Sequence, residues 1–350
     1  MEERANWAPS SVVRDGEPGR GLRVAIAGAS HWHLPRHAQH LREAGALLVA
    51  VSDPDLSVAA RQAEELGCPA VPDAAAIAGE VRPDLVLALG RVCDMAEQAR
   101  VLVGAGLPLL AEKPLGLNGQ EVSTLAALAR ARDAWISVAL VQRYDPLWAL
   151  LDRLRDAGQL GSVTHLHVRT INGPPQRYAA WGSGWMLRPA TAGGGALLNL
   201  GIHGADSFLH LAEEPAEVAG AAITSRAYNQ EVEDFGAMTL RSGSGLVGAI
   251  EAGYTYPDAT AGMTRSGDNE VRIGASQVYL IARDADVAQV TAEAGEQSLG
   301  GLRGGDRYRD WMFDSLARYR SGQPPLAGID DCLAAVRLID EAYAKAGRVR

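Results

Sequence analysis

The sequence predicts an α/β protein with two domains: an open parallel sheet with helices, followed by an α+β domain with a large, mostly antiparallel sheet. Three observations support this prediction. The 350 residues correspond to about two domains at roughly 150 residues each. Between residues 22 and 137, short apolar runs alternate with amphipathic segments of helix length, as in βαβ units. Beyond residue 157 the apolar runs are separated by Gly, Ser and Asp turns, which indicates antiparallel strands.

The elements follow from these patterns in chain order. After a loose tail over 1–20, the first domain (21–140) has expected strands at 22–27, 47–51, 85–89, 108–111 and 136–139. Its expected helices are 35–44, 56–66, 93–103 and 119–132. The second domain (141–350) has expected strands at 163–170, 217–224, 235–240, 246–252 and 277–282, and helices at 146–157, from Ala196, at 307–319 and at 329–346. The last helix can pack back on the first domain.

Composition narrows the functional classes. A net charge of -9, with 33 Lys and Arg against 42 Asp and Glu, excludes a broad basic surface for nucleic acid. The three cysteines are far apart and odd in number, so neither a disulfide framework nor a Cys-x-x-Cys site is expected, which fits a cytoplasmic protein. The sequence contains no run of about 18 apolar residues, so we expect no membrane span.

The first expected strand runs into a turn that is typical of a Rossmann dinucleotide-binding domain. Gly28 is the only one of the three usual glycines, and the expected cofactor contacts of the turn are Gly28, Ser30, His31, Trp32 and His33. Asp53 follows the second strand, 25 residues beyond Gly28, where a carboxylate binds the adenosine ribose and repels a 2′-phosphate. We therefore predict NAD rather than NADP. The alternative is that Asp53 is a simple turn acid before Pro54.

Two further motifs carry candidate chemistry. Lys113, in Glu112-Lys113-Pro114, follows the strand at 108–111 and is expected to project into the ligand crevice, held by Glu112; an exposed charged turn is the alternative. Three glycines, 193–195, precede Asn199, His203 and Asp206, which lie on one face of a helix because they are spaced i, i+4 and i+7. The alternative is a structural histidine in a helix that packs on the sheet.

Together these motifs resemble the Gfo/Idh/MocA oxidoreductase family, and residues 142–146 are similar to the segment that opens its second domain. The resemblance implies that Lys113 is the catalytic lysine, which contacts both cofactor and substrate. It implies that His203 is the general acid or base and Asp206 the acid that follows it. Asn199 stands where family members often have Asp, so it can orient a hydroxyl but cannot share a proton. Glu112 and Arg143 are expected at the cofactor, and Arg143 also at the substrate.

A second departure from the family follows the third expected strand. The chain has Leu89-Gly90-Arg91 and Asp94 where the family commonly has Thr-Pro and a histidine. We expect these four residues near the cofactor, with Arg91 either on the pyrophosphate or solvated. The Trp-, Gly- and Pro-rich segment 173–195 is expected to line a sugar pocket with Tyr178, Trp181, Trp185 and Arg188. The alternative is that its tryptophans only anchor a loop by packing.

The sequence thus predicts an NAD-dependent oxidoreductase that transfers hydride between nicotinamide and a secondary hydroxyl or ketone of a sugar, polyol or cyclitol, with Lys113 and His203 handling the proton. The alternatives are an NAD-retaining lyase or glycosidase that uses transient oxidation, and a non-catalytic regulator that binds cofactor and sugar. The family resemblance also implies a homodimer or homotetramer.

Four of the eight histidines lie within ten residues, at positions 31, 33, 37 and 40. A metal site is not expected, because no cysteine or carboxylate lies near them in the sequence. His31 and His33 fall in the cofactor turn, whereas His37 and His40 are expected to form the polar side of the helix that follows.

Overall fold

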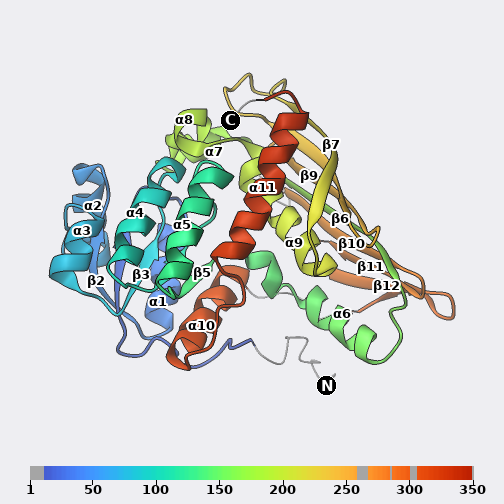
Figure 1. The fold of residues 1–350 in the computed structure, drawn as a ribbon, viewed down its shortest axis with the longest axis horizontal. Helices are drawn as coiled ribbons and strands as arrows, with labels where there is room; N and C mark the ends of the chain where they lie inside the picture. Colours follow the sequence, from blue (N-terminus) through green and yellow to red (C-terminus); the bar gives the residue numbers. More distant parts are fainter. Residues whose placement is uncertain (1–11, 258–266, 284–285, 300–305, 349–350) are drawn as a thin grey trace.

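The computed structural model describes residues 12–257, 267–283, 286–299 and 306–348. It contains two sheets, which occupy opposite halves of the molecule in Figure 1, with helix α11 running between them. Residues 1–11 of the predicted tail lie outside the described residues. Residues 12–20 are packed rather than loose, because Val13 N donates to Asp314 and Gly19 N donates to Ala44 O.

The first sheet is parallel throughout and has the order β2-β1-β3-β4-β5. Its strands are β1 (Arg23–Ala27), β2 (Leu47–Ser52), β3 (Leu85–Ala88), β4 (Leu109–Ala111) and β5 (Ile136–Val138). The helices that connect them are α1 (Leu34–Glu43), α2 (Leu56–Leu66), the short α3 (Ala74–Ala76) and η1 (Ile77–Val81), α4 (Val92–Gly104) and α5 (Gly119–Ala131). Strands β3 to β5 are buried along their whole length, as expected for a parallel sheet covered on both faces.

The second sheet has eight strands in the order β13-β12-β11-β10-β6-β9-β8-β7, and only the β6–β9 pair is parallel. Its strands are β6 (Val163–Asn172), β7 (Ala216–Thr224), β8 (Phe235–Ser242), β9 (Val247–Gly253), β10 (Gly267–Ala275), β11 (Val278–Arg283), β12 (Asp286–Thr291) and β13 (Gly295–Ser298). The sequence pattern did not predict β10, β12 and β13. Strand β10 begins Gly-Asp-Asn-Glu, and β13 is exposed at every position, so neither shows the apolar alternation of a half-buried strand.

The remaining helices lie in the second half of the chain. They are η2 (Val141–Tyr144), α6 (Pro146–Asp156), α7 (Gln176–Ala180), η3 (Gly184–Leu187), α8 (Pro189–Ala192), η4 (Leu197–Gly201) and α9 (Ile202–Ala212), with α10 (Arg307–Arg320) and α11 (Ile329–Lys345) at the end of the chain. Helix α11 contacts α5 of the first half as well as α9 and β7 of the second (Figure 1). Gly119 N of α5 donates to Asp340 of α11, so this helix joins the two halves.

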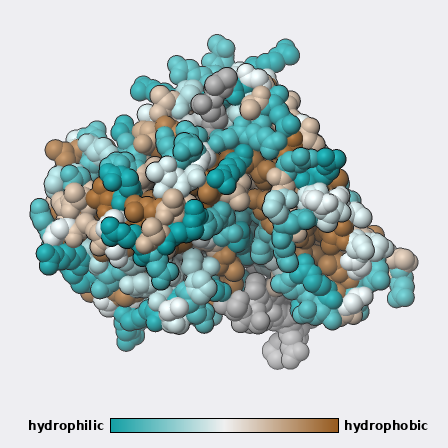
Figure 2. Space-filling view, viewed as in Figure 1, coloured by the Kyte–Doolittle hydropathy of each residue, from teal (hydrophilic) through white to brown (hydrophobic). Residues whose placement is uncertain are grey.

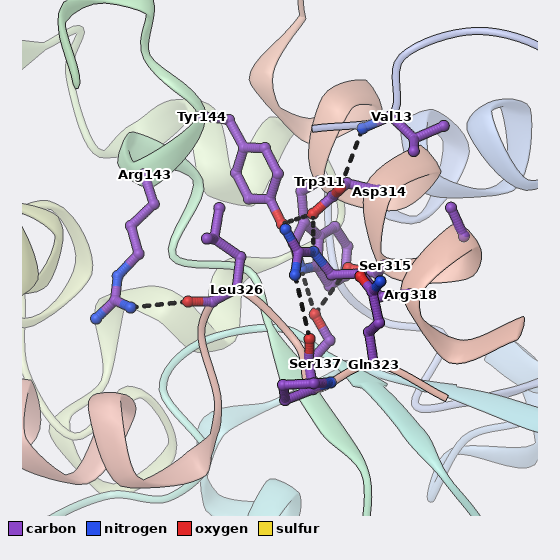
Figure 3. A network of polar contacts seen from close by, with 12 residues as sticks. Val13, Ser137, Arg143, Tyr144, Trp311, Asp314, Ser315, Arg318, Gln323 and Leu326 are labelled. Carbon is purple, nitrogen blue, oxygen red and sulfur yellow. Dashed lines mark hydrogen bonds and ion pairs between the residues drawn. The ribbon is translucent and has the colours of Figure 1, made fainter. Parts of the chain in front are cut away.

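Helix α10 is held against the first sheet by a buried polar network (Figure 3). The Asp314 carboxylate accepts from the Tyr144 hydroxyl at 3.2 Å and from the Arg318 guanidinium at 2.7 Å. Beside it, Trp311 Nε1 donates to Ser137 Oγ of β5 at 3.0 Å. These bonds satisfy polar groups that would otherwise be costly to bury, and they fix η2 at the edge of the site.

The face of the molecule shown in Figure 2 is largely hydrophilic, with hydrophobic residues scattered among the hydrophilic ones. Within the described residues, the structure has no helix that combines the length and hydropathy of a membrane span.

Candidate active site

The turn after β1 depends on Gly28. Its φ is +89°, and a Cβ placed on it would lie 1.7 Å from the carbonyl oxygen of Leu89. Gly90, with φ of +121°, packs against it from the loop after β3. The two glycines therefore allow the ends of β1 and β3 to approach more closely than any side chain would permit.

Replacing Gly28 by Ala is expected to lower the free energy of unfolding by about 2–4 kcal/mol, because left-handed backbone strain adds to a backbone clash. Urea denaturation of the purified variant measures this loss. Gly158→Ala is the matched control, since Gly158 has a φ of +68° but open space around its Cα. It should lose only about 1–2 kcal/mol. Equal losses in the two variants would show that the contact with Leu89 contributes nothing.

Asp53 supports the turn directly. Its Oδ2 accepts from Ala29 N at 2.8 Å and from Ser30 N at 2.9 Å, while its Oδ1 accepts from Asp55 N. The residue is only 3% exposed. The expected ribose acceptor therefore has both oxygens bonded to backbone amides, two of which belong to the turn that receives a pyrophosphate in this fold.

The same turn is fastened to the second half of the chain. Ser30 O accepts from Ser183 Oγ at 2.9 Å and from Trp185 Nε1 at 3.0 Å. Trp32 stacks on His31 with a centroid distance of 3.8 Å and lies 5.8 Å from the Trp185 ring. We call this contact between residues 30–32 and residues 183–185 the Ser30 clasp. Trp185, expected to line a sugar pocket, has its indole N–H bonded within the clasp.

Trp185→Phe is expected to lower the free energy of unfolding by about 1 kcal/mol, because one hydrogen bond of the clasp is lost. Trp181→Phe is the matched control, since Trp181 is 53% exposed and its replacement should change stability by less than about 0.5 kcal/mol. Thermal and urea unfolding curves check both values. A Trp185→Phe variant as stable as its control would mean that the clasp bond is energetically neutral.

Lys113 and Asn199 form the centre of the site. Lys113 is 6% exposed, and its Nζ donates to the carbonyl oxygen of Asn199 at 2.7 Å and to its side-chain Oδ1 at 2.9 Å. Asn199 lies in η4, a wide π-helical turn, a feature that often marks functional sites. Burial lowers the pKa of Lys113. The expectation that Glu112 holds this lysine is wrong, because the ammonium faces Asn199 instead.

The Asn199 amide connects the lysine to two tyrosines. Its Nδ2 donates to the Tyr178 hydroxyl at 2.8 Å and to the Tyr254 hydroxyl at 3.0 Å, and both tyrosines are buried. Tyr254, directly after β9, was not predicted as a site residue. Its position immediately beyond a strand is too weak a signal to identify it, since the contact depends on how η4 packs against β9.

His203 faces the same cavity from the first turn of α9. It is 7% exposed, and its Nδ1 has no hydrogen-bond partner among the described residues. Burial lowers its pKa well below the usual value, and the charge of Lys113 lowers it further. The imidazole is therefore neutral at pH 7 and able to accept a proton.

Asp206 points away from His203. Its carboxylate accepts from Arg143 Nη2 at 2.6 Å and from Nε at 3.0 Å, and Asp331 of α11 accepts from the same guanidinium at 2.8 Å. Arg143 Nη1 also donates to Leu326 O, the contact drawn in Figure 3. Burial raises the pKa of Asp206 to about 6. Arg143 is thus bonded within the protein on all sides, which does not support its expected role at cofactor and substrate.

Three other expected site residues lie apart from Lys113. Arg91 and Asp94 form an ion pair at 2.6 Å, and the Arg91 side chain is 38% exposed. Arg188 is exposed at the start of α8. Leu89, in contrast, is fully buried and serves as the wall against which Gly28 packs.

The histidine cluster differs from its expected arrangement. His37 and His40 are not the polar side of α1, because they are 0% and 4% exposed. Glu112 Oε1 accepts from His33 Nδ1 at 2.7 Å and lies 2.8 Å from His37 Nε2. The expectation that no carboxylate lies near these histidines is therefore wrong. Glu112 is distant in sequence, but β4 brings it into contact with the cluster.

Lys113, Asn199 and His203 line a cavity of about 1000 Å³. It extends from Val58 and Arg61 of α2, beside the Gly28 turn, to Lys113, Asn199 and His203. A cavity that joins the adenosine end of a Rossmann crevice to a buried Lys–His pair fits a dinucleotide with a small substrate at its far end. Its cationic lining residues are Arg36, Arg61, Lys113, Arg177 and Arg307.

Comparison with known proteins agrees with this geometry. Residues 22–140 match the family model of the NAD-binding Rossmann fold of the GFO/IDH/MocA oxidoreductases, and residues 148–277 match that of their C-terminal domain. Inositol 2-dehydrogenase 4 of Saccharopolyspora erythraea is 32% identical over 163 residues, which cover 45% of this chain and 48% of that protein. The chain thus matches about half the length of this relative.

Two more proteins resemble the chain over a longer stretch. A dTDP-3,4-didehydro-2,6-dideoxy-alpha-D-glucose 3-reductase of Streptomyces antibioticus is 29% identical over 68% of this chain and 71% of its own. The structure of levoglucosan dehydrogenase with NADH and levoglucosan has a TM-score of 0.80 at 17% identity, covering 93% of this chain and 97% of that one. The chain belongs to the Gfo/Idh/MocA family of oxidoreductases, and its first domain is an NAD-binding Rossmann domain.

Proposed function

We propose that the protein is an NAD-dependent oxidoreductase that interconverts a secondary hydroxyl and a ketone on a sugar, polyol or cyclitol. The observation that carries this proposal is the pair of buried side chains, Lys113 and His203, at the same end of the large cavity. Relatives named inositol 2-dehydrogenase and D-glucoside 3-dehydrogenase support the substrate class.

The chain's own residues supply the proton chemistry. NAD held by the turn after β1 would supply the hydride acceptor, and NADH the hydride donor. Lys113 binds the substrate oxygen and stabilises its developing negative charge. This electrostatic stabilisation is strongest in a buried site. The neutral imidazole of His203 accepts the hydroxyl proton as a general base. Asn199 is a positioning residue, because its two oxygens hold the Lys113 ammonium.

The choice of lysine at position 113 supports its chemical role. Of the 33 Lys and Arg residues in the chain, only Lys113 and Lys345 are lysines. Arginine stays charged in proteins, whereas a buried lysine can shift its pKa and present a compact ammonium to one oxygen. Among the described cationic residues that line the cavity, Lys113 alone is buried, and the other four are arginines.

The decisive experiment measures NADH formation by its absorbance with NAD and a panel of sugars and polyols, alongside thermal shifts with NAD and NADP. Because five cationic side chains line the cavity, the panel includes phosphorylated and carboxylated sugars as well as neutral ones. Substrate-dependent NADH formation supports the proposal. Turnover without net NADH would favour the NAD-retaining lyase or glycosidase, and binding without turnover the regulator. A larger stabilisation by NADP would overturn the cofactor assignment.

We further propose a cytoplasmic homodimer or homotetramer, assembled through the face of the second sheet opposite α9 and α11. Native mass spectrometry at micromolar concentration tests this assembly. A single monomer mass would refute it.

A further inference from the structure

We propose that His31, His33 and Glu112 form a binding site for one divalent transition-metal ion, with zinc as the ion used to test it. One ring nitrogen from each imidazole and one carboxylate oxygen all lie within 4.8 Å of one another. Two imidazoles and one carboxylate are the protein ligands of zinc sites that keep a position open for water or substrate.

The three ligands are fixed in place by their surroundings. His31 and His33 are separated by one residue of the cofactor turn, and the backbone N of His33 donates to His31 Nδ1 at 3.1 Å. The His31 ring is stacked on Trp32. Glu112 is also oriented by His37, whose Nε2 lies 2.8 Å from the same Oε1 that His33 contacts, while its Oε2 accepts from Lys113 N at 3.2 Å. Such an outer contact orients a metal-binding carboxylate. A zinc ion with bonds of about 2.0–2.1 Å would need only small side-chain shifts.

The charge balance of Glu112 is the second observation. Its carboxylate is 1% exposed, and among the described residues its ion-pair partners are His33 and His37 alone. The neighbouring Lys113 ammonium is directed to Asn199. Buried carboxylates are normally paired with a cation or coordinate a metal. These two contacts already stabilise the carboxylate, and a divalent ion bound by Glu112, His31 and His33 would replace the His33–Glu112 contact with a stronger positive charge.

The site borders the reaction space. His31 and His33 line the large cavity, and His31 and Glu112 line a smaller cavity on the other side of the turn, whereas Lys113 contributes to both. If the proposed oxidoreductase function holds, an ion there would act as a Lewis acid on the substrate oxygen beside Lys113 and His203. No bond is formed or broken on the ion itself, so binding can be tested without turnover.

The test begins with the full chain, stripped by a chelator and reloaded with zinc, followed by elemental analysis after dialysis. We expect about one zinc per chain. Glu112→Gln and His33→Gln should each weaken zinc affinity by at least about 10–100-fold. His40→Gln is the matched control, because His40 is a buried histidine of α1, the helix that follows His33, and its Nε2 lies 3.2 Å from Asp306 Oδ2. It should keep the zinc content of the unmodified protein.

Folding of each variant is checked by its thermal unfolding curve, and the same curve gives a second readout. Zinc at about 100 times its dissociation constant should raise the Tm of the unmodified protein by about 4 °C and leave Glu112→Gln unchanged. If the protein instead binds one equivalent of another divalent transition metal, and Glu112→Gln loses it, the site is supported with a different ion. The proposal is overturned if the unmodified protein binds no metal, or if Glu112→Gln and His33→Gln both retain it. Neither result depends on sugar oxidation, so failure here leaves the proposed function intact.

Discussion

Replacing Lys113 by Ala is expected to lower kcat by about 10²–10³-fold, because a buried charge that stabilises the reacting oxygen is removed. The ammonium is held at 2.7 Å and 2.9 Å by the two oxygens of Asn199, so its position in the site is fixed. The measurement is steady-state turnover on a substrate identified by the panel, with KM determined in parallel. The loss should appear mainly in kcat, since the interaction strengthens as charge develops on the oxygen.

Lys345→Ala is the matched control for this variant. Lys345 is the other lysine of the chain, and it forms a surface ion pair with Glu341 at 3.7 Å, far from the cavity in sequence and in the fold. Its replacement should leave kcat unchanged. The mechanism assigned to Lys113 is wrong if both variants turn over substrate like the unmodified protein.

Replacing His203 by Gln is expected to lower kcat for alcohol oxidation by about 10²–10⁴-fold, the usual contribution of a general base. The unmodified protein should also show a distinct pH profile. Burial and then Lys113 lower the pKa of His203 well below 6.5, with Glu112 acting in the opposite direction and Arg307 and His33 adding to the lowering. Oxidation requires the neutral imidazole, so kcat/KM should stay level as pH falls to 6.5 and decline only below it.

The matched control is His210→Gln, on the same helix as His203. Burial lowers the pKa of His210 to about 4, but the residue packs against Trp148 and does not line the cavity. The acid limb of the profile should disappear in His203→Gln and persist in His210→Gln. An unchanged limb in His203→Gln would assign the base to another group.

The sequence predicted the order of elements in the first half well, because each parallel strand there is a short apolar run and β3 to β5 are buried along their whole length. Helix α2 begins and ends at the predicted residues, Leu56 and Leu66, since Asp55 caps its start and Gly67 its end. The sequence pattern did not predict the strands at the edge of the second sheet that are polar. Strand β13 is exposed at each residue, so its pairing with β12 leaves no hydrophobic pattern to recognise.

The candidate site was predicted in its residue types but not in its contacts. Lys113, Asn199 and His203 come together as the motifs suggest. The hydrogen-bond partner of each side chain depends on which strand ends lie side by side in the fold. The spacing of residues along the chain does not show which ends these are. Glu112 is 79 positions from His33, yet their side chains lie 2.7 Å apart because β4 and the turn after β1 end at the same edge. Asp206 likewise turns to Arg143 because η2 crosses α9.

The Ser30 clasp links the two ligand sites energetically. The carbonyl of Ser30 belongs to the cofactor turn, whereas its donors, Ser183 and Trp185, belong to the segment that encloses the substrate side. A ligand that shifts this carbonyl must also shift the indole of Trp185, which walls the smaller cavity. The affinities for cofactor and substrate are then coupled, and reciprocity requires that each ligand change the affinity of the other by the same factor. The carbonyl oxygen of Ser30 is therefore the point at which we expect each ligand to change the affinity for the other.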